Sequence, residues 1–130
     1  MVSASKKITT HNFELEIHEA GYYLIKVFGA DEFTVDDLKI LVRAQKELGA
    51  NIIPSLVICT EQASTNIELL NTLAKKAFNP YSLADAFVLS SMSQRILANF
   101  YIKINKPERP TKFFTDTYTA LIWLKNFTTH

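Results

Sequence analysis

Two nearly uninterrupted apolar runs, residues 52–59 and 83–89, constrain the fold of this chain more than any other feature. Such runs are typical of central strands that are covered on both faces, as in parallel sheets. Each run is followed by a segment whose apolar residues recur at helical spacing. Buried strands that alternate with amphipathic helices predict an α/β domain with a mostly parallel sheet and right-handed crossovers.

The segments before the first run predict a hairpin and a helix. Residues 13–17 alternate apolar and acidic side chains, which is typical of a half-buried edge strand. Residues 22–28 are rich in aromatic and β-branched side chains and are expected to form the second strand of an antiparallel hairpin. Thr34 is then placed to cap a helix that ends near Gly49.

The rest of the chain predicts three helices and one more strand, over residues 111–114. The helices are expected to begin near Ser64 or Thr65, at Ser91, and at Thr115 or Asp116. The predicted order is ββαβαβαβα, a mixed, mostly parallel five-stranded sheet whose first strand is antiparallel, with helices on both faces. We expect residues 1–12 to form a flexible N-terminal segment and residues 13–130 a single domain.

The composition narrows the class of protein. A chain of 130 residues can bury about two-thirds of its unfolded surface, so its core needs no metal or disulfide. The formal net charge of +1 gives no overall attraction to nucleic acid. The single cysteine excludes an internal disulfide, and the sequence has neither a signal peptide nor a membrane-spanning apolar stretch. We therefore expect a cytoplasmic protein with no nucleic-acid partner and no integral membrane segment.

The residues that usually carry catalysis do not form a recognisable set. His11, His18 and His130 share no short ligand spacing with Cys59, which argues against a metal site. Three glycines cannot build a phosphate-binding loop, and no G-x-S-x-G motif is present. Cys59 ends a buried apolar run, where cysteines usually belong to the core. We expect no metal, no cofactor and no enzymatic activity.

Polar residues follow each predicted parallel strand, at the sheet edge where α/β proteins usually bind ligands. These candidates are Thr60, Glu61, Ser64, Thr65, Ser90, Ser91, Ser93, Thr115 and Asp116. Backbone N–H groups at the helix starts can hold an anion or a phosphate there. The same hydroxyls also serve as ordinary helix caps, so both interpretations stay open.

The carboxyl-terminal half resembles a known family. Residues 112–116 (KFFTD) and 120–124 (ALIWL) form a short strand, a polar cap and a helix with an A-x-x-W-L pattern. Together with residues 85–90, 95–100 and 105–107, they resemble the SpoIIAA-like group of the STAS fold. The STAS fold is that of anti-anti-sigma factors, and the SpoIIAA-like group is often placed beside the lipid-binding CRAL-TRIO domains. The resemblance implies a small bacterial protein of this fold.

The resemblance also implies a role in binding partners. Anti-anti-sigma factors bind an anti-sigma kinase and are switched by phosphorylation of a serine in an Asp-Ser pair that opens the helix after a central strand. The matching residues 60–65 contain Ser64 but lack the Asp-Ser pair. Ser64 is therefore the residue that such a switch would use, since a phosphate is stabilised at a helix start.

Three functions are compatible with these observations. The first is a non-enzymatic regulatory or protein-interaction module, which can form a homodimer through an edge strand and its unevenly distributed charges. The alternative is a domain that binds a small molecule, an anion or a lipid at the carboxyl-terminal edge of the sheet. The third is an enzyme, which would need an acid–base pair such as Glu61 and Asp116 beside a pocket.

Overall fold

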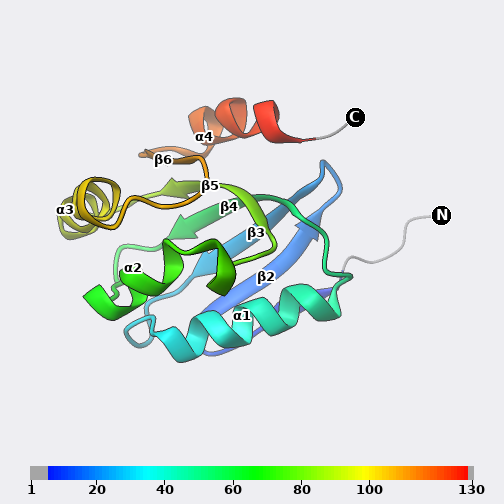
Figure 1. The fold of residues 1–130 in the computed structure, drawn as a ribbon, viewed down its shortest axis with the longest axis horizontal. Helices are drawn as coiled ribbons and strands as arrows, with labels where there is room; N and C mark the ends of the chain where they lie inside the picture. Colours follow the sequence, from blue (N-terminus) through cyan, green and yellow to red (C-terminus); the bar gives the residue numbers. More distant parts are fainter. Residues whose placement is uncertain (1–5, 129–130) are drawn as a thin grey trace.

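The computed structural model of the protein describes residues 6–128 and contains a six-stranded sheet (Figure 1). The elements in chain order are β1 (Lys7–Thr9), β2 (Phe13–His18), β3 (Tyr22–Val27), α1 (Val35–Glu47), β4 (Ile53–Cys59), α2 (Ile67–Leu73), η1 (Lys76–Phe78), β5 (Ser82–Val88), α3 (Met92–Phe100), η2 (Tyr101–Asn105), β6 (Thr111–Phe114), α4 (Thr117–Leu124) and η3 (Lys125–Phe127). The strand order in the sheet follows the chain from β1 to β6. Neighbouring strands are antiparallel from β1 to β3 and parallel from β3 to β6. Residues 1–5 of the expected flexible segment, and residues 129–130, lie outside the described residues.

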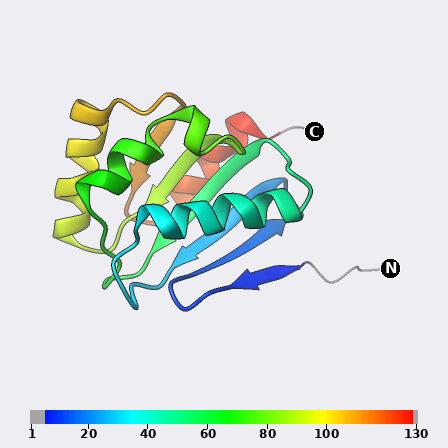
Figure 2. The same ribbon diagram turned by 60° about the horizontal axis from the view of Figure 1, so that its bottom comes forward.

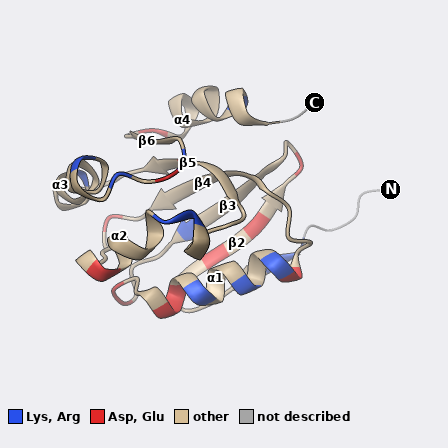
Figure 3. Ribbon diagram, in the orientation of Figure 1, with Lys and Arg blue, Asp and Glu red and all other residues tan. Residues whose placement is uncertain are grey.

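The strand count corrects the expectation of five strands, because β1 lies within the segment that was expected to be flexible. Ile8 of β1 pairs with Leu15 of β2, and its side chain packs against the core. The ammonium group of Lys7 lies 3.8 Å from the carboxylates of both Glu14 and Glu16. Figure 3 shows acidic residues in red along β2. The alternating acidic residues of β2, which predicted an exposed edge strand, therefore form ion pairs that help to hold β1 against β2.

Helices cover both faces of the sheet, as expected, with three on one face and one on the other (Figures 1 and 2). Right-handed crossovers that always step to the next strand place α1, α2 and α3 on the same face. There they pack on strand residues such as Ile25 and Val57. The last helix, α4, follows the last strand and returns over the opposite face, where Leu124 packs with Leu56 and Ala86.

The helix after β4 begins later than expected. Ser64 or Thr65 was expected at its start, but the cap is Asn66, whose side chain accepts a hydrogen bond from the backbone N–H of Leu69 over 2.8 Å. Thr65 instead forms an isolated β-bridge with Phe33, and its hydroxyl donates to the Phe33 carbonyl oxygen over 2.6 Å. A contact 32 residues away in the sequence therefore holds Thr65 in an extended conformation.

The buried side of α3 continues into η2. Gln94, Ala98 and Tyr101 are buried at i, i+4 and i+7 spacing, so they form the side that faces the sheet. In contrast, Ile96 of α3 and Ile104 of η2 are each 63 % exposed. None of the helices in residues 6–128 combines the length and the apolar character that crossing a bilayer requires.

Candidate functional site

Gln94 joins two loops at the carboxyl-terminal edge of the sheet. Its side-chain oxygen accepts a hydrogen bond from the backbone N–H of Ser90 over 2.7 Å. Its side-chain amide donates to the carbonyl oxygens of Thr60, over 2.7 Å, and Ala63, over 2.9 Å. The Gln94 side chain is buried, so these bonds are shielded from water and hold the loops after β4 and β5 against the start of α3.

The hydroxyl groups expected at this edge make bonds within the fold. The Thr60 hydroxyl donates to the carbonyl oxygen of Phe28, and the Ser90 hydroxyl donates to that of Cys59, each over 2.7 Å. Ser91 caps α3 as predicted, accepting from the backbone N–H of Gln94 over 3.2 Å. Thr60, Ser90 and Ser91 are thus brought together, and their hydroxyls hold the loops in place.

Other predicted site residues have exposed side chains or belong to the opposite face of the sheet. Glu61, Ser64 and Ser93 are exposed, and phosphorylation of Ser64 stays a prediction. Thr115 is also exposed, and Asp116 caps α4 on the opposite face of the sheet. The backbone N–H of Thr119, followed by its hydroxyl, donates to Asp116 and lowers the pKa of that carboxyl.

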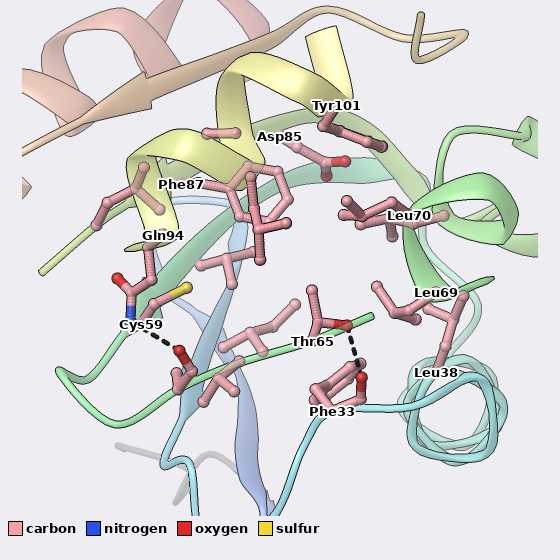
Figure 4. Close-up of a pocket in the computed structure, with 18 of the residues that line it drawn as sticks. Phe33, Leu38, Cys59, Thr65, Leu69, Leu70, Asp85, Phe87, Gln94 and Tyr101 are labelled. Carbon is pink, nitrogen blue, oxygen red and sulfur yellow. Dashed lines mark hydrogen bonds between the residues drawn. The ribbon is translucent and has the colours of Figure 1, made fainter. Parts of the chain in front are cut away.

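An apolar cavity of about 140 Å³ lies between the sheet and helices α1, α2 and α3 (Figure 4). Its walls include Phe33, Leu38, Leu69, Leu70, Phe87 and Tyr101. Ala63 and Ala98 also line the cavity, and their short side chains leave room that larger residues would fill. The cavity is therefore bounded by side chains from three helices and from the sheet.

The cavity reaches from the carboxyl-terminal edge of the sheet towards the opposite edge. Its lining includes Cys59 at the end of β4 and Ser55, four residues earlier, a separation of about 13 Å along a strand. Asp85 pairs with Ser55 in the sheet and lines the same end. Figure 4 shows Asp85 and Tyr101 at one end of the cavity, with Thr65 towards the other.

A buried ion pair stands at the end of the cavity that is lined by Asp85. The guanidinium of Arg109 lies 3.1 Å from the Asp85 carboxylate and also donates to the carbonyl oxygen of Leu73 over 3.0 Å. The Ser82 hydroxyl bonds to Asp85 and lies 2.8 Å from the hydroxyl of Ser55. Burial raises the pKa of the Asp85 carboxyl, against the opposing effects of Arg109 and Ser82. The Asp85 carboxyl group is thus held by Arg109 and by the Ser82 hydroxyl.

Several buried polar atoms have unused hydrogen-bonding capacity. Within residues 6–128, no partner is found for the Tyr101 hydroxyl, the side-chain oxygen of Gln45, or Nε and Nη2 of Arg109. Tyr101 and Gln45 both line the cavity. Buried polar atoms in native proteins are almost always paired, so these two side chains are candidates for contact with a ligand or water, with the Arg109 guanidinium beside the Tyr101 hydroxyl.

Cys59 is not an activated nucleophile. Burial raises the pKa of its thiol to about 12, so the thiol stays protonated at neutral pH. Among the described residues, no three His, Cys, Asp or Glu side chains lie close enough together to hold a metal ion.

Sequence reasoning did not find the cavity or the Arg109 partner of Asp85. The interruption of the apolar run 83–89 by an aspartate was the one available signal, because a charge in a buried strand requires a partner. The cavity has no such signal, since it depends on how side chains from separate elements pack.

Comparison with known proteins supports the fold. No similar sequence was found among curated proteins. The structure of this chain is similar to the crystal structure of an uncharacterised protein of the DUF3478 family from Shewanella loihica PV-4, which is described as having a SpoIIAA-like fold. The two chains share 17 % sequence identity, and the TM-score is 0.62. The match covers 95 % of this chain and 99 % of the Shewanella protein, which confirms the predicted SpoIIAA-like fold. A family model described as a domain of unknown function, DUF7793, matches residues 18–128.

Proposed function

This chain belongs to the DUF7793 family of domains of unknown function, and we propose that it is a non-enzymatic binding module that holds a small apolar molecule in its cavity. The cavity is the observation that carries the proposal. An engineered apolar cavity of about 150 Å³ in another protein binds benzene, so a volume of about 140 Å³ suits a ligand with the bulk of one aromatic ring.

The energetics of packing favour a bound molecule. In large-to-small core substitutions each Å³ of cavity left behind costs about 24 cal/mol, so unfilled apolar space in a core is unfavourable. A ligand that fills the space recovers part of this free energy through contacts with the walls. The non-enzymatic part of the proposal rests on the protonated Cys59 thiol and on the bonds that occupy the Asp85 carboxyl. A cytoplasmic location, expected from the sequence, belongs to the same proposal.

A benzene titration followed by ¹H–¹⁵N NMR tests the proposal. We expect saturable shifts of amide signals from residues around the cavity, such as Leu69 and Leu70. Ala98→Leu, which fills the cavity, should abolish these shifts. Ala77→Leu makes the same chemical change at an exposed position and should leave them unchanged. Absence of saturable binding to the wild-type protein would refute the proposal.

The exposed side of α3 favours a second candidate, a protein-interaction module that pairs with a second copy of this chain. Met92 and Ile96, one helical turn apart, are 66 % and 63 % exposed. Apolar side chains grouped on an exposed helix are typical of interfaces. Sedimentation velocity should show a dimer that Ile96→Lys dissociates. Ile40→Lys, at an exposed isoleucine of α1, is the matched control, and a wild-type monomer at all concentrations would refute this candidate.

A further inference from the structure

We propose that the cavity selects a small neutral alcohol or phenol, whose oxygen accepts a hydrogen bond from the Tyr101 hydroxyl while its apolar body lies among Leu69, Leu70 and Phe87. This inference rests on the proposed function and names the chemical class of its ligand.

The position of Tyr101 carries the inference. Its side chain is 1 % exposed, lines the cavity, and lies beside Asp85 at one end of the cavity in Figure 4. The ring is held by edge contacts with Phe87 and Phe113, with centroids 6.5 and 6.4 Å away. The Tyr101 side chain lines the cavity, and its hydroxyl has no hydrogen-bond partner among residues 6–128. The neighbouring Arg109 guanidinium, which lowers the pKa of this hydroxyl, has no acceptor atom for its proton, so the O–H remains free to donate.

The chemistry of the hydroxyl determines what it can bind. Burial raises the pKa of Tyr101, which keeps the proton on the oxygen and makes the group a hydrogen-bond donor. A ligand oxygen that accepts a hydrogen bond from this hydroxyl removes the free-energy cost of leaving the buried group unpaired. A purely apolar ligand of the same size leaves that cost in place.

The charge around this end of the cavity favours a neutral ligand over an anion. Asp85 already balances the charge of Arg109 at 3.1 Å, and both side chains are almost fully buried. A second carboxylate here would leave one negative charge unbalanced in an apolar space. A neutral hydroxyl adds no charge. The orphaned oxygen of Gln45 in the cavity wall is a further acceptor for a ligand hydroxyl, but it offers an anion no proton.

The test compares the dissociation constants of phenol, benzene and benzoate by NMR titration. For the wild-type protein we expect phenol to bind about tenfold more tightly than benzene, since one hydrogen bond to an otherwise unpaired donor is gained. Benzoate should show no saturable binding. Tyr101→Phe should remove the preference for phenol while leaving benzene binding intact. Tyr23→Phe removes the hydroxyl of another buried tyrosine, outside the cavity lining, and should leave the preference unchanged.

The outcomes separate this inference from the proposed function. Equal affinity of the wild-type protein for benzene and phenol would overturn the role of Tyr101 while leaving the cavity as a binding site. Tighter binding of benzoate than of phenol would overturn the preference for a neutral ligand. Failure of all three probes to bind would refute the proposed function and this inference together. The wild-type comparison decides the question even if Tyr101→Phe does not fold.

Discussion

We expect removal of the Tyr101 hydroxyl to stabilise the ligand-free protein. An unsatisfied buried hydroxyl costs about 1–3 kcal/mol, and Tyr101→Phe deletes this group while keeping the ring contacts with Phe87 and Phe113. A net gain of about 1 kcal/mol in the free energy of unfolding corresponds to a Tm increase of about 3–5 °C for a chain of this size. Urea unfolding at neutral pH, with an unchanged m-value, measures the difference.

Tyr23 provides a control in which the free energy of unfolding should change in the opposite direction. The Tyr23 hydroxyl donates to the carbonyl oxygen of Asn51 over 2.5 Å, and its side chain is also fully buried. Tyr23→Phe therefore loses a hydrogen bond and should lower the free energy of unfolding by about 1 kcal/mol. A loss of stability in Tyr101→Phe as large as in Tyr23→Phe would contradict the reasoning, because it would mean that the Tyr101 hydroxyl is paired in solution.

Three further changes test other parts of the structure. Asp85→Asn leaves Arg109 buried without its counter-charge and should cost about 3–5 kcal/mol, measured by urea unfolding. The lowered pKa of Asp116 means that its contribution is present above the usual aspartate pKa of 3.8 and is lost as the pH falls through the folded-state value. Asp116→Ala should therefore lower Tm at pH 7, with a difference from wild type that shrinks below pH 4, and a constant difference would contradict the assignment. Gly29 has a φ of +76°, and an added Cβ would lie 2.5 Å from backbone atoms of the loop after β4. Gly21 has a φ of +93° but lies in open space. Gly29→Ala should therefore lower the free energy of unfolding far more than Gly21→Ala. Equal losses in the two glycine variants would show that this loop can move aside.

Local patterns predicted the central part of the fold. The apolar runs correspond to β4 and β5, and residues 111–114 coincide with β6. Ser91 and Asp116 cap their helices as expected, because a cap is decided by residues within one helical turn. These features need no information from distant parts of the chain.

Features that depend on distant contacts were missed. Three residues are too few to mark β1 by their own pattern, and its position depends on the acids of β2. Thr65 carries the side chain of a good cap, yet its bonds to Phe33 leave that role to Asn66. In the candidate site, too, the features that depend on distant contacts were missed. The edge hydroxyls were located by topology, but their bonds to loop carbonyls, and the partner of Asp85, could not be read from neighbouring residues.

The agreement between strand order and chain order has a consequence for synthesis. Because each strand from β2 to β6 pairs with the strand made just before it, every strand that leaves the ribosome meets a partner edge that is already available. The helices that cover the first face are also made before β6. The opposite face, with Leu56 and Ala86, stays uncovered until α4 is made, after β6. A nascent or truncated chain that lacks α4 therefore presents an uncovered apolar sheet face to chaperones and to other unfinished chains.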